Sequence, residues 1–128
     1  MVDHWLDRET KGVPADRLLL LFERAIAALW RRTHVTLGEV TLGAVIERVL
    51  YHATEKYPFL APLEVGHEGV RFERLRQTLD PSVAPVTEAF RFVLVEFLTV
   101  IGNLTDDILT PALHSELSSV QGDHEARP

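Results

Sequence analysis

The sequence contains no cysteine among its 128 residues, which excludes a disulfide framework and any thiolate metal site. It also lacks long hydrophobic runs. Its runs of large apolar side chains, LLLLF at 18–22 and FVLV at 92–95, each end at a glutamate and fall far short of the roughly 20 apolar residues that span a bilayer. The first residues, MVDHWLDRETKG, have no apolar core of the kind found in a secretory signal. We therefore expect a cytoplasmic protein with no membrane partner.

Positive charge is also scarce in this sequence. The 13 Lys and Arg residues stand against 19 Asp and Glu residues, which gives a formal net charge of −6. Nucleic-acid-binding proteins carry a basic excess, so we expect no nucleic-acid partner. The composition, with 46% hydrophobic and 25% charged residues, is typical of a globular protein, and 128 residues are enough for one domain with its own core.

Apolar residues recur at steps of three and four along most of the chain, and no stretch shows the alternation of a β-strand. The predicted fold is therefore all-α, a compact four- to five-helix bundle. We expect long helices at about 15–32, 40–56 and 85–108, and short helices at about 70–79 and 111–120. The predicted organisation is a polar N-terminal arm at 1–13, a single helical-bundle domain at 14–120 and a disordered tail at 121–128.

The segment from Thr33 to Thr41 is predicted to connect the first two helices. Within it, Thr36-Leu-Gly-Glu39 matches a capping box, in which the threonine and glutamate side chains satisfy free backbone N–H groups at a helix start. The second helix is therefore expected to begin near Leu37 or near Leu42.

The helix predicted at 85–108 contains FRFVLVEFLTVIGNL, in which Glu96 is the only acidic residue. At about 100° per residue, one side of this helix is a continuous apolar face that includes Val93 and Phe97, and we expect that face in the core. Another side combines large apolar residues with small and polar ones: Phe92, Val95, Glu96, Thr99, Gly102 and Asn103. These residues are called the mixed seam below.

Three arrangements would explain the mixed seam. The helix could pack on both sides within its own bundle, the seam could contact a second copy of the chain in a symmetric dimer, or it could line a ligand pocket. If the seam is covered, Glu96 needs a partner, because a buried unpaired carboxylate would take up a proton instead. Arg24, Arg48 and Arg91 are the candidate partners.

Residue patterns of catalysis and metal binding are absent from the sequence. His52 lies at the margin of an apolar helical stripe, but it is followed by Ala53 and has its lysine, Lys56, four residues on. Neither position fits the patterns of histidine phosphotransfer proteins or histidine kinases. The only Glu-x-x-His sequence, Glu64 to His67, lies beside glycines rather than on a predicted helix, as a di-iron bundle would require. We therefore predict no catalytic residue, no metal site and no cofactor.

The function predicted from these features is a non-catalytic protein-interaction or regulatory module. It would form a homodimer through the helix at 85–108, with the mixed seam as the interface, and it could bind a further protein partner. The alternative is a small-ligand sensor with a pocket between the helices at 40–56 and 85–108. The polar lining of that pocket would be His52, Glu96, Thr99 and Asn103.

Overall fold

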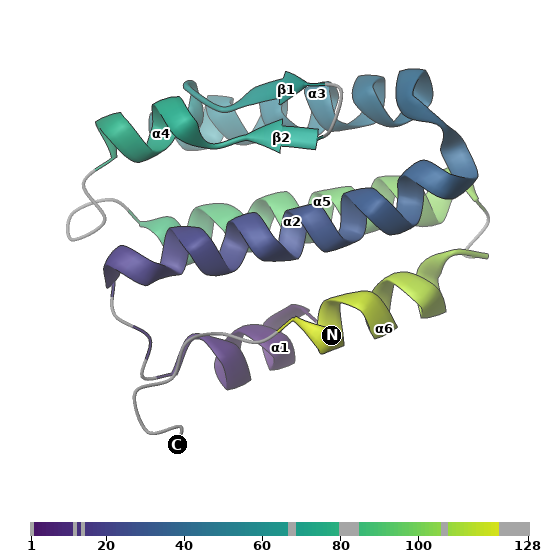
Figure 1. The fold of residues 1–128 in the computed structure, drawn as a ribbon, viewed down its shortest axis with the longest axis horizontal. Helices are drawn as coiled ribbons and strands as arrows, with labels where there is room; N and C mark the ends of the chain where they lie inside the picture. Colours follow the sequence, from purple (N-terminus) through teal and green to yellow (C-terminus); the bar gives the residue numbers. More distant parts are fainter. Residues whose placement is uncertain are drawn as a thin grey trace.

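The computed structural model describes residues 2–11, 13, 15–66, 69–79, 85–105 and 108–120 (Figure 1). In these residues the helices are α1 (Val2–Glu9), α2 (Ala15–Leu37), α3 (Glu39–Lys56), α4 (Glu73–Thr78), α5 (Val86–Leu104) and α6 (Thr110–Ser119). A 3-10 turn, η1 (Pro58–Leu60), and an antiparallel hairpin of β1 (Glu64–Gly66) and β2 (Gly69–Arg71) follow α3. The predicted all-α bundle is confirmed, with one more helix than expected and a small hairpin.

The helices are arranged in three layers (Figure 1). The long helices α2 and α5 form the middle layer, α3 lies on one side of it with the hairpin and α4, and the short helices α1 and α6 lie on the other side. One hydrophobic core connects the layers. At its centre Phe90 of α5 stacks on Phe22 of α2 and on Phe72, with ring centroids 5.0 Å and 5.7 Å apart.

The segment predicted as a polar N-terminal arm at 1–13 contains the helix α1, which packs on the rest of the molecule. Val2, Trp5 and Leu6 are spaced to lie on one side of α1, and all three are buried in the core. The Trp5 indole N–H donates a hydrogen bond to the backbone carbonyl of Val120, 3.1 Å away. Asp3 forms an ion pair with Arg91 of α5. These contacts attach α1 to both α5 and the C-terminal end of α6.

The predicted connection at Thr33 to Thr41 is largely helical. The helix α2 continues to Leu37, and Thr33 within it is fully buried with its hydroxyl satisfied by the Leu29 carbonyl at 2.6 Å. Only Gly38 interrupts the helices, with φ +80°, a backbone conformation that glycine adopts without a steric penalty. The predicted capping box is also wrong, because α3 starts directly after Gly38 without a side-chain cap.

The predicted helix at 70–79 begins later and is preceded by a strand. Gly69–Arg71 pairs with Glu64–Gly66, and the helix covers only Glu73–Thr78. Gly69 has φ +124°, and a Cβ there would lie 3.4 Å from the ring of Trp30. Strands of three residues are too short to show alternation, which explains why the sequence did not predict them. The predicted disordered tail at 121–128 lies outside the described residues.

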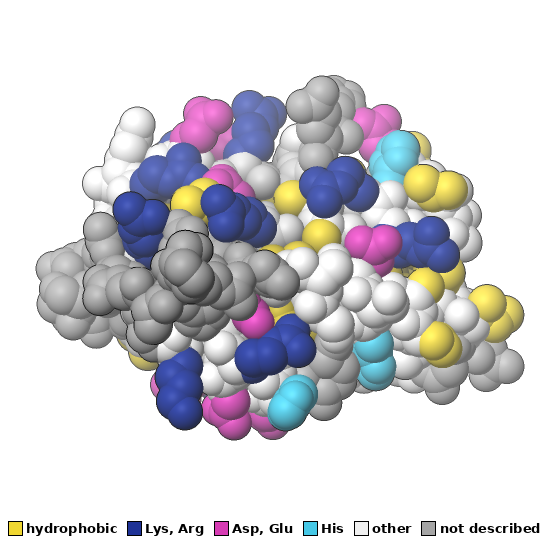
Figure 2. Space-filling view, turned by 60° about the horizontal axis from the view of Figure 1, so that its bottom comes forward, with side chains coloured by type: hydrophobic (Ala, Val, Ile, Leu, Met, Phe, Trp, Pro, Cys, Tyr) yellow, Lys and Arg dark blue, Asp and Glu magenta, His cyan; other side chains and the backbone are white. Residues whose placement is uncertain are grey.

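On the face shown in Figure 2, acidic and basic side chains are mixed, and several hydrophobic side chains show at the right-hand end as well as between the charged ones. At this end α2 and α5 terminate and α3 begins (Figure 1). In the described part of the chain, no helix combines the length and the hydrophobicity needed to cross a membrane.

Candidate functional site

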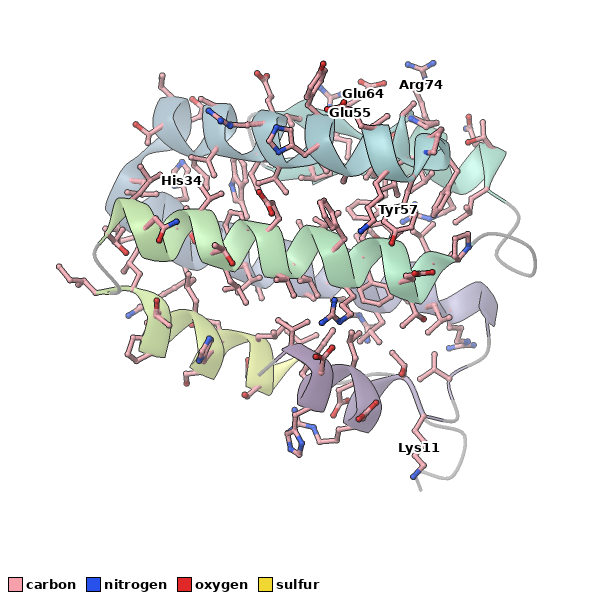
Figure 3. The ribbon with its side chains drawn as sticks, turned by 180° about the vertical axis from the view of Figure 1, so that it is seen from behind. Lys11, His34, Glu55, Tyr57, Glu64 and Arg74 are labelled. Atoms are coloured by element: carbon pink, nitrogen blue, oxygen red, sulfur yellow. The ribbon has the colours of Figure 1, made fainter. Side chains whose placement is uncertain are left out.

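The predicted core face of α5 lies in the core. Phe90, Val93, Leu94, Phe97 and Ile101 are each buried to 3% exposure or less. The opposite side of α5 faces outward between α3 and the pair formed by α1 and α6, as the view from behind shows (Figure 3). The mixed seam therefore lies on a helix whose outward side remains accessible.

The residues of the mixed seam differ in their exposure. Val95, Thr99 and Asn103 are exposed, Phe92 and Glu96 are half-buried, and Gly102 is buried. The Thr99 hydroxyl donates to the Val95 carbonyl at 2.8 Å, so its donor is satisfied within α5 itself. Four of the six predicted residues, Val95, Glu96, Thr99 and Asn103, thus present side chains to solvent along α5.

Phe92 contacts the end of α3 in the same chain. The Tyr57 ring meets it edge to face with centroids 6.2 Å apart, and the Lys56 ammonium lies 5.1 Å from the centre of the Phe92 ring. Figure 3 shows Tyr57 beside α5. Partial burial raises the pKa of the Tyr57 hydroxyl, and the nearby Glu88 carboxylate raises it further. Phe92 is therefore mainly an internal contact between α3 and α5.

Glu96 and His52 are brought together across the α3–α5 contact. The His52 Nδ1 and the Glu96 Oε1 are 3.9 Å apart, and both side chains are partly exposed. Arg91, one of the three predicted partners of Glu96, forms its ion pair with Asp3 instead. Tyr51, with 66% of its surface exposed, lies beside His52 with ring centroids 6.0 Å apart. Tyr51 and Val95 are therefore exposed apolar groups on adjacent helices, and each is the sequence neighbour of one member of the His52–Glu96 pair.

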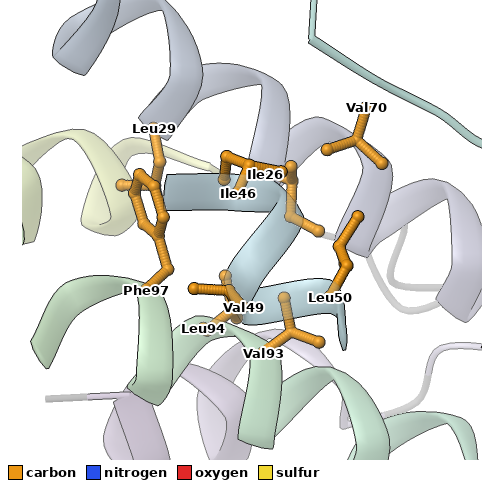
Figure 4. Close-up of a pocket in the computed structure, with 9 residues that line it drawn as sticks. All are labelled: Ile26, Leu29, Ile46, Val49, Leu50, Val70, Val93, Leu94 and Phe97. Atoms are coloured by element: carbon orange, nitrogen blue, oxygen red, sulfur yellow. The ribbon is translucent and has the colours of Figure 1, made fainter. Parts of the chain in front are cut away.

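A small void lies between α2, α3 and α5 (Figure 4). Its free volume is about 10 Å³, and its lining consists entirely of apolar side chains: Ile26, Leu29, Ile46, Val49, Leu50, Val70, Val93, Leu94 and Phe97. A single water molecule needs roughly 10–15 Å³ and polar partners, so this void has no room for a ligand. His52, Glu96, Thr99 and Asn103 do not line it.

The described residues contain no group of three or more His, Cys, Asp or Glu side chains that could hold a metal ion. Glu64 of the Glu-x-x-His sequence accepts a hydrogen bond from Arg74 at 3.0 Å, and His67 lies outside the described residues. The contact of Lys56 and Tyr57 with Phe92 was missed by the sequence analysis. The only feature of the sequence that could have indicated this contact is that Lys56 and Tyr57 lie at the end of the helix predicted at 40–56. Comparison of the chain with protein families, with curated proteins and with solved structures finds no match.

Proposed function

We propose that this chain is a non-catalytic protein-interaction module that forms a homodimer through the outward side of α5. The observation that supports it best is the exposed pair of apolar side chains on adjacent helices. Val95 of α5 is 36% exposed and Tyr51 of α3 is 66% exposed, with the His52–Glu96 pair between their helices. Val95 would give the contact an apolar centre and the polar side chains beside it, including Glu96, would form its border, which is the usual composition of a specific protein interface.

In the proposed dimer, α5 packs against α5 of the second copy about a two-fold axis. Such an isologous contact is the commonest geometry of homo-oligomers. Val95 and Thr99 would lie at its centre, with Glu96 and Asn103 forming hydrogen bonds at its border. Phe92 would support the contact from the side, since it already packs on Tyr57. Gly102 is covered by its own chain, so we assign it no direct contact.

The small-ligand sensor has less support. Its polar residues separate along α5, because Asn103 lies seven residues beyond Glu96, about 10 Å along the helix. The void near them is apolar and smaller than a ligand.

The proposal is tested by measuring the molar mass in solution by sedimentation equilibrium over a range of concentrations. We expect the mass to rise from the 14.5 kDa of one chain to twice that value. Val95→Glu would place an unpaired carboxylate near Glu96 in the contact, at a cost of about 3 kcal/mol, or roughly 100-fold weaker association. Val35→Glu introduces the same charge at another exposed valine, on α2, and should leave association unchanged.

A single-chain mass at all concentrations would contradict the proposal. So would a pair of variants with the opposite order of effects, in which Val35→Glu dissociates the protein and Val95→Glu does not.

A further inference from the structure

The long helix α2 has one uncovered side. In Figure 1 it lies in front of α5, and no helix or strand crosses in front of it. Its buried residues, which include Phe22 and Leu29, occupy about 200° on the remaining sides. Five residues that are exposed or half-buried lie within about 80° of one another on the uncovered side: Leu20, Arg24, Ala27, Arg31 and Val35. These five residues are called the outward stripe below.

The outward stripe carries positive charge that has no partner within the described part of the chain. Among the described residues, five arginines form no ion pair: Arg24, Arg31, Arg32, Arg48 and Arg71. Three of these five are exposed residues of α2. Glu23, the acidic residue of α2 whose side chain the structure describes, is already held by Arg76 at 2.7 Å. A chain with a net charge of −6 thus concentrates its unpaired positive charge on α2.

Apolar residues separate the two arginines of the outward stripe. The steps between its five residues are four, three, four and four, so apolar and basic side chains alternate over about 22 Å of helix. Leu20 is 38% exposed and Val35 is 83% exposed. The small side chain of Ala27, in the middle, allows a second backbone to approach closely. Steps of three and four residues are those at which one helix packs along another.

The stripe combines two features that distinguish among anionic partners. A phosphate or a nucleic acid would pair with the arginines but leave Leu20 and Val35 in water, and the net charge of −6 opposes a long polyanion. An amphipathic helix with acidic residues satisfies both the charges and the apolar groups. Two carboxylates seven positions apart on such a helix are separated by about 10.5 Å along its axis, which is also the separation of Arg24 and Arg31.

We propose that the outward stripe of α2 binds an amphipathic helix of a partner protein that carries two acidic residues seven positions apart. The two carboxylates pair with Arg24 and Arg31. Apolar residues of the partner, at the steps between its acidic residues, pack on Leu20, Ala27 and Val35. Arg17 continues the line of arginines at the same spacing, but it already has an interaction and is therefore not part of the proposed contact.

The occupant is not a second copy of this chain. Two acidic residues seven positions apart on one described helix occur only at Asp16 and Glu23, and the Glu23 carboxylate is already occupied by Arg76. The inference is also independent of the proposed dimer. The outward stripe faces the viewer in Figure 1, whereas the outward side of α5 faces the viewer in Figure 3, which shows the molecule from behind.

The test uses the full chain and a capped helical peptide of alanine and glutamine, about 20 residues long, in an NMR titration of backbone amide shifts. The peptide has leucine at its second, ninth and seventeenth positions and glutamate at its sixth and thirteenth, which repeats the steps of the stripe. We expect shifts in residues 20–35 and a dissociation constant that rises with ionic strength. A peptide with its glutamates at the fourth and eleventh positions, on the opposite side of its helix, should bind about tenfold more weakly.

Two pairs of variants connect binding to the arginines. Arg24→Gln and Arg31→Gln should each weaken peptide binding about twofold to fivefold. Arg48→Gln is the matched control, because it removes another exposed and unpaired arginine, on α3, and it should bind like the unmodified protein. The double variant Arg24→Glu with Arg31→Glu should lose the glutamate peptide and bind a peptide with lysines at the same two positions. Such an exchange of specificity requires direct pairing at these two residues.

The variants of the dimer test separate this inference from the proposed function. Val35→Glu places a carboxylate on the outward stripe, so it should weaken binding of the glutamate peptide while leaving self-association unchanged. Val95→Glu should do the reverse, since it lies on α5. A failed dimer and a failed partner site therefore give different results.

Four outcomes would overturn the inference. They are the absence of shifts at millimolar peptide, equal affinity for the two glutamate peptides, an equal loss in Arg48→Gln and Arg24→Gln, and a charge-reversed double variant that does not bind the lysine peptide. Inorganic polyphosphate that binds through Arg24 and Arg31 where the peptide does not would also overturn it, because the stripe would then be a phosphate site.

Discussion

Phe92 and Phe97 are close in sequence, yet their surroundings predict different energetic roles. Phe97 is 3% exposed and lies in the core, so Phe97→Ala should lower the free energy of unfolding by about 3–5 kcal/mol. Phe92 is half-buried and contacts mainly Tyr57 and Lys56, so Phe92→Ala should cost only about 1–2 kcal/mol. Urea denaturation followed by circular dichroism, at one fixed protein concentration, measures both. Equal losses for the two variants would mean that the two sides of α5 are packed alike.

The two sides of α5 could be predicted from the sequence because helical periodicity depends only on residue spacing. Val93 and Phe97 are buried and Val95 and Thr99 are exposed, as their positions around the helix imply. The partner of Glu96 could not be predicted in this way. It depends on how α3 and α5 are aligned along each other, and that alignment brings His52 within 3.9 Å.

At the scale of an element, α1 was missed because its helical signal is very short. Val2, Trp5 and Leu6 follow the spacing of a helix, but the charged residues around them make the segment polar overall. An isolated helix of this length is marginal in water, so its stability comes from packing on α5 and α6. The hairpin was missed for a similar reason, since Glu64–Gly66 and Gly69–Arg71 are held by pairing and by burial of Gly69 against Trp30.

The attachment of α1 to α5 should depend on pH through Asp3. The hydrogen bond from Arg91 lowers the pKa of the Asp3 carboxyl from its ordinary value of 3.8. The ion pair therefore contributes stability above that ordinary value, and the contribution is lost as the pH falls through the lowered folded-state pKa. Asp3→Asn should have a lower thermal midpoint than the unmodified protein at pH 6, and the two midpoints should converge in acid.

Asp7→Asn is the matched control for this measurement. It removes the same charge from the same helix, where Asp7 forms no ion pair with a described residue. Its midpoint should follow that of the unmodified protein at both pH values. A constant difference between Asp3→Asn and the unmodified protein down to pH 2 would mean that the ion pair does not connect α1 to α5.

At the scale of the whole molecule, one core joins the three layers. Trp5 of α1 packs on Phe22 with ring centroids 6.1 Å apart, Phe22 stacks on Phe90, and Phe90 stacks on Phe72 beside the hairpin. This aromatic series crosses all three layers. A core that is continuous across the layers predicts that they unfold together rather than one after another.

The two tryptophans allow this cooperativity to be measured from opposite sides. Trp5 reports on the layer of α1 and α6, and Trp30, 4% exposed beside Gly69, reports on the contact of α2 with the hairpin. Trp5→Phe and Trp30→Phe each leave a single tryptophan. Both variants should be less stable than the unmodified protein. Trp5→Phe additionally removes the indole N–H that donates to the Val120 carbonyl. Within each variant, however, the fluorescence and circular dichroism midpoints should coincide in urea. If the Trp5 signal changed at lower urea than the circular dichroism signal, α1 and α6 would form a separate unit. The outward side of α5 beside them would then be a surface that opens before the core does.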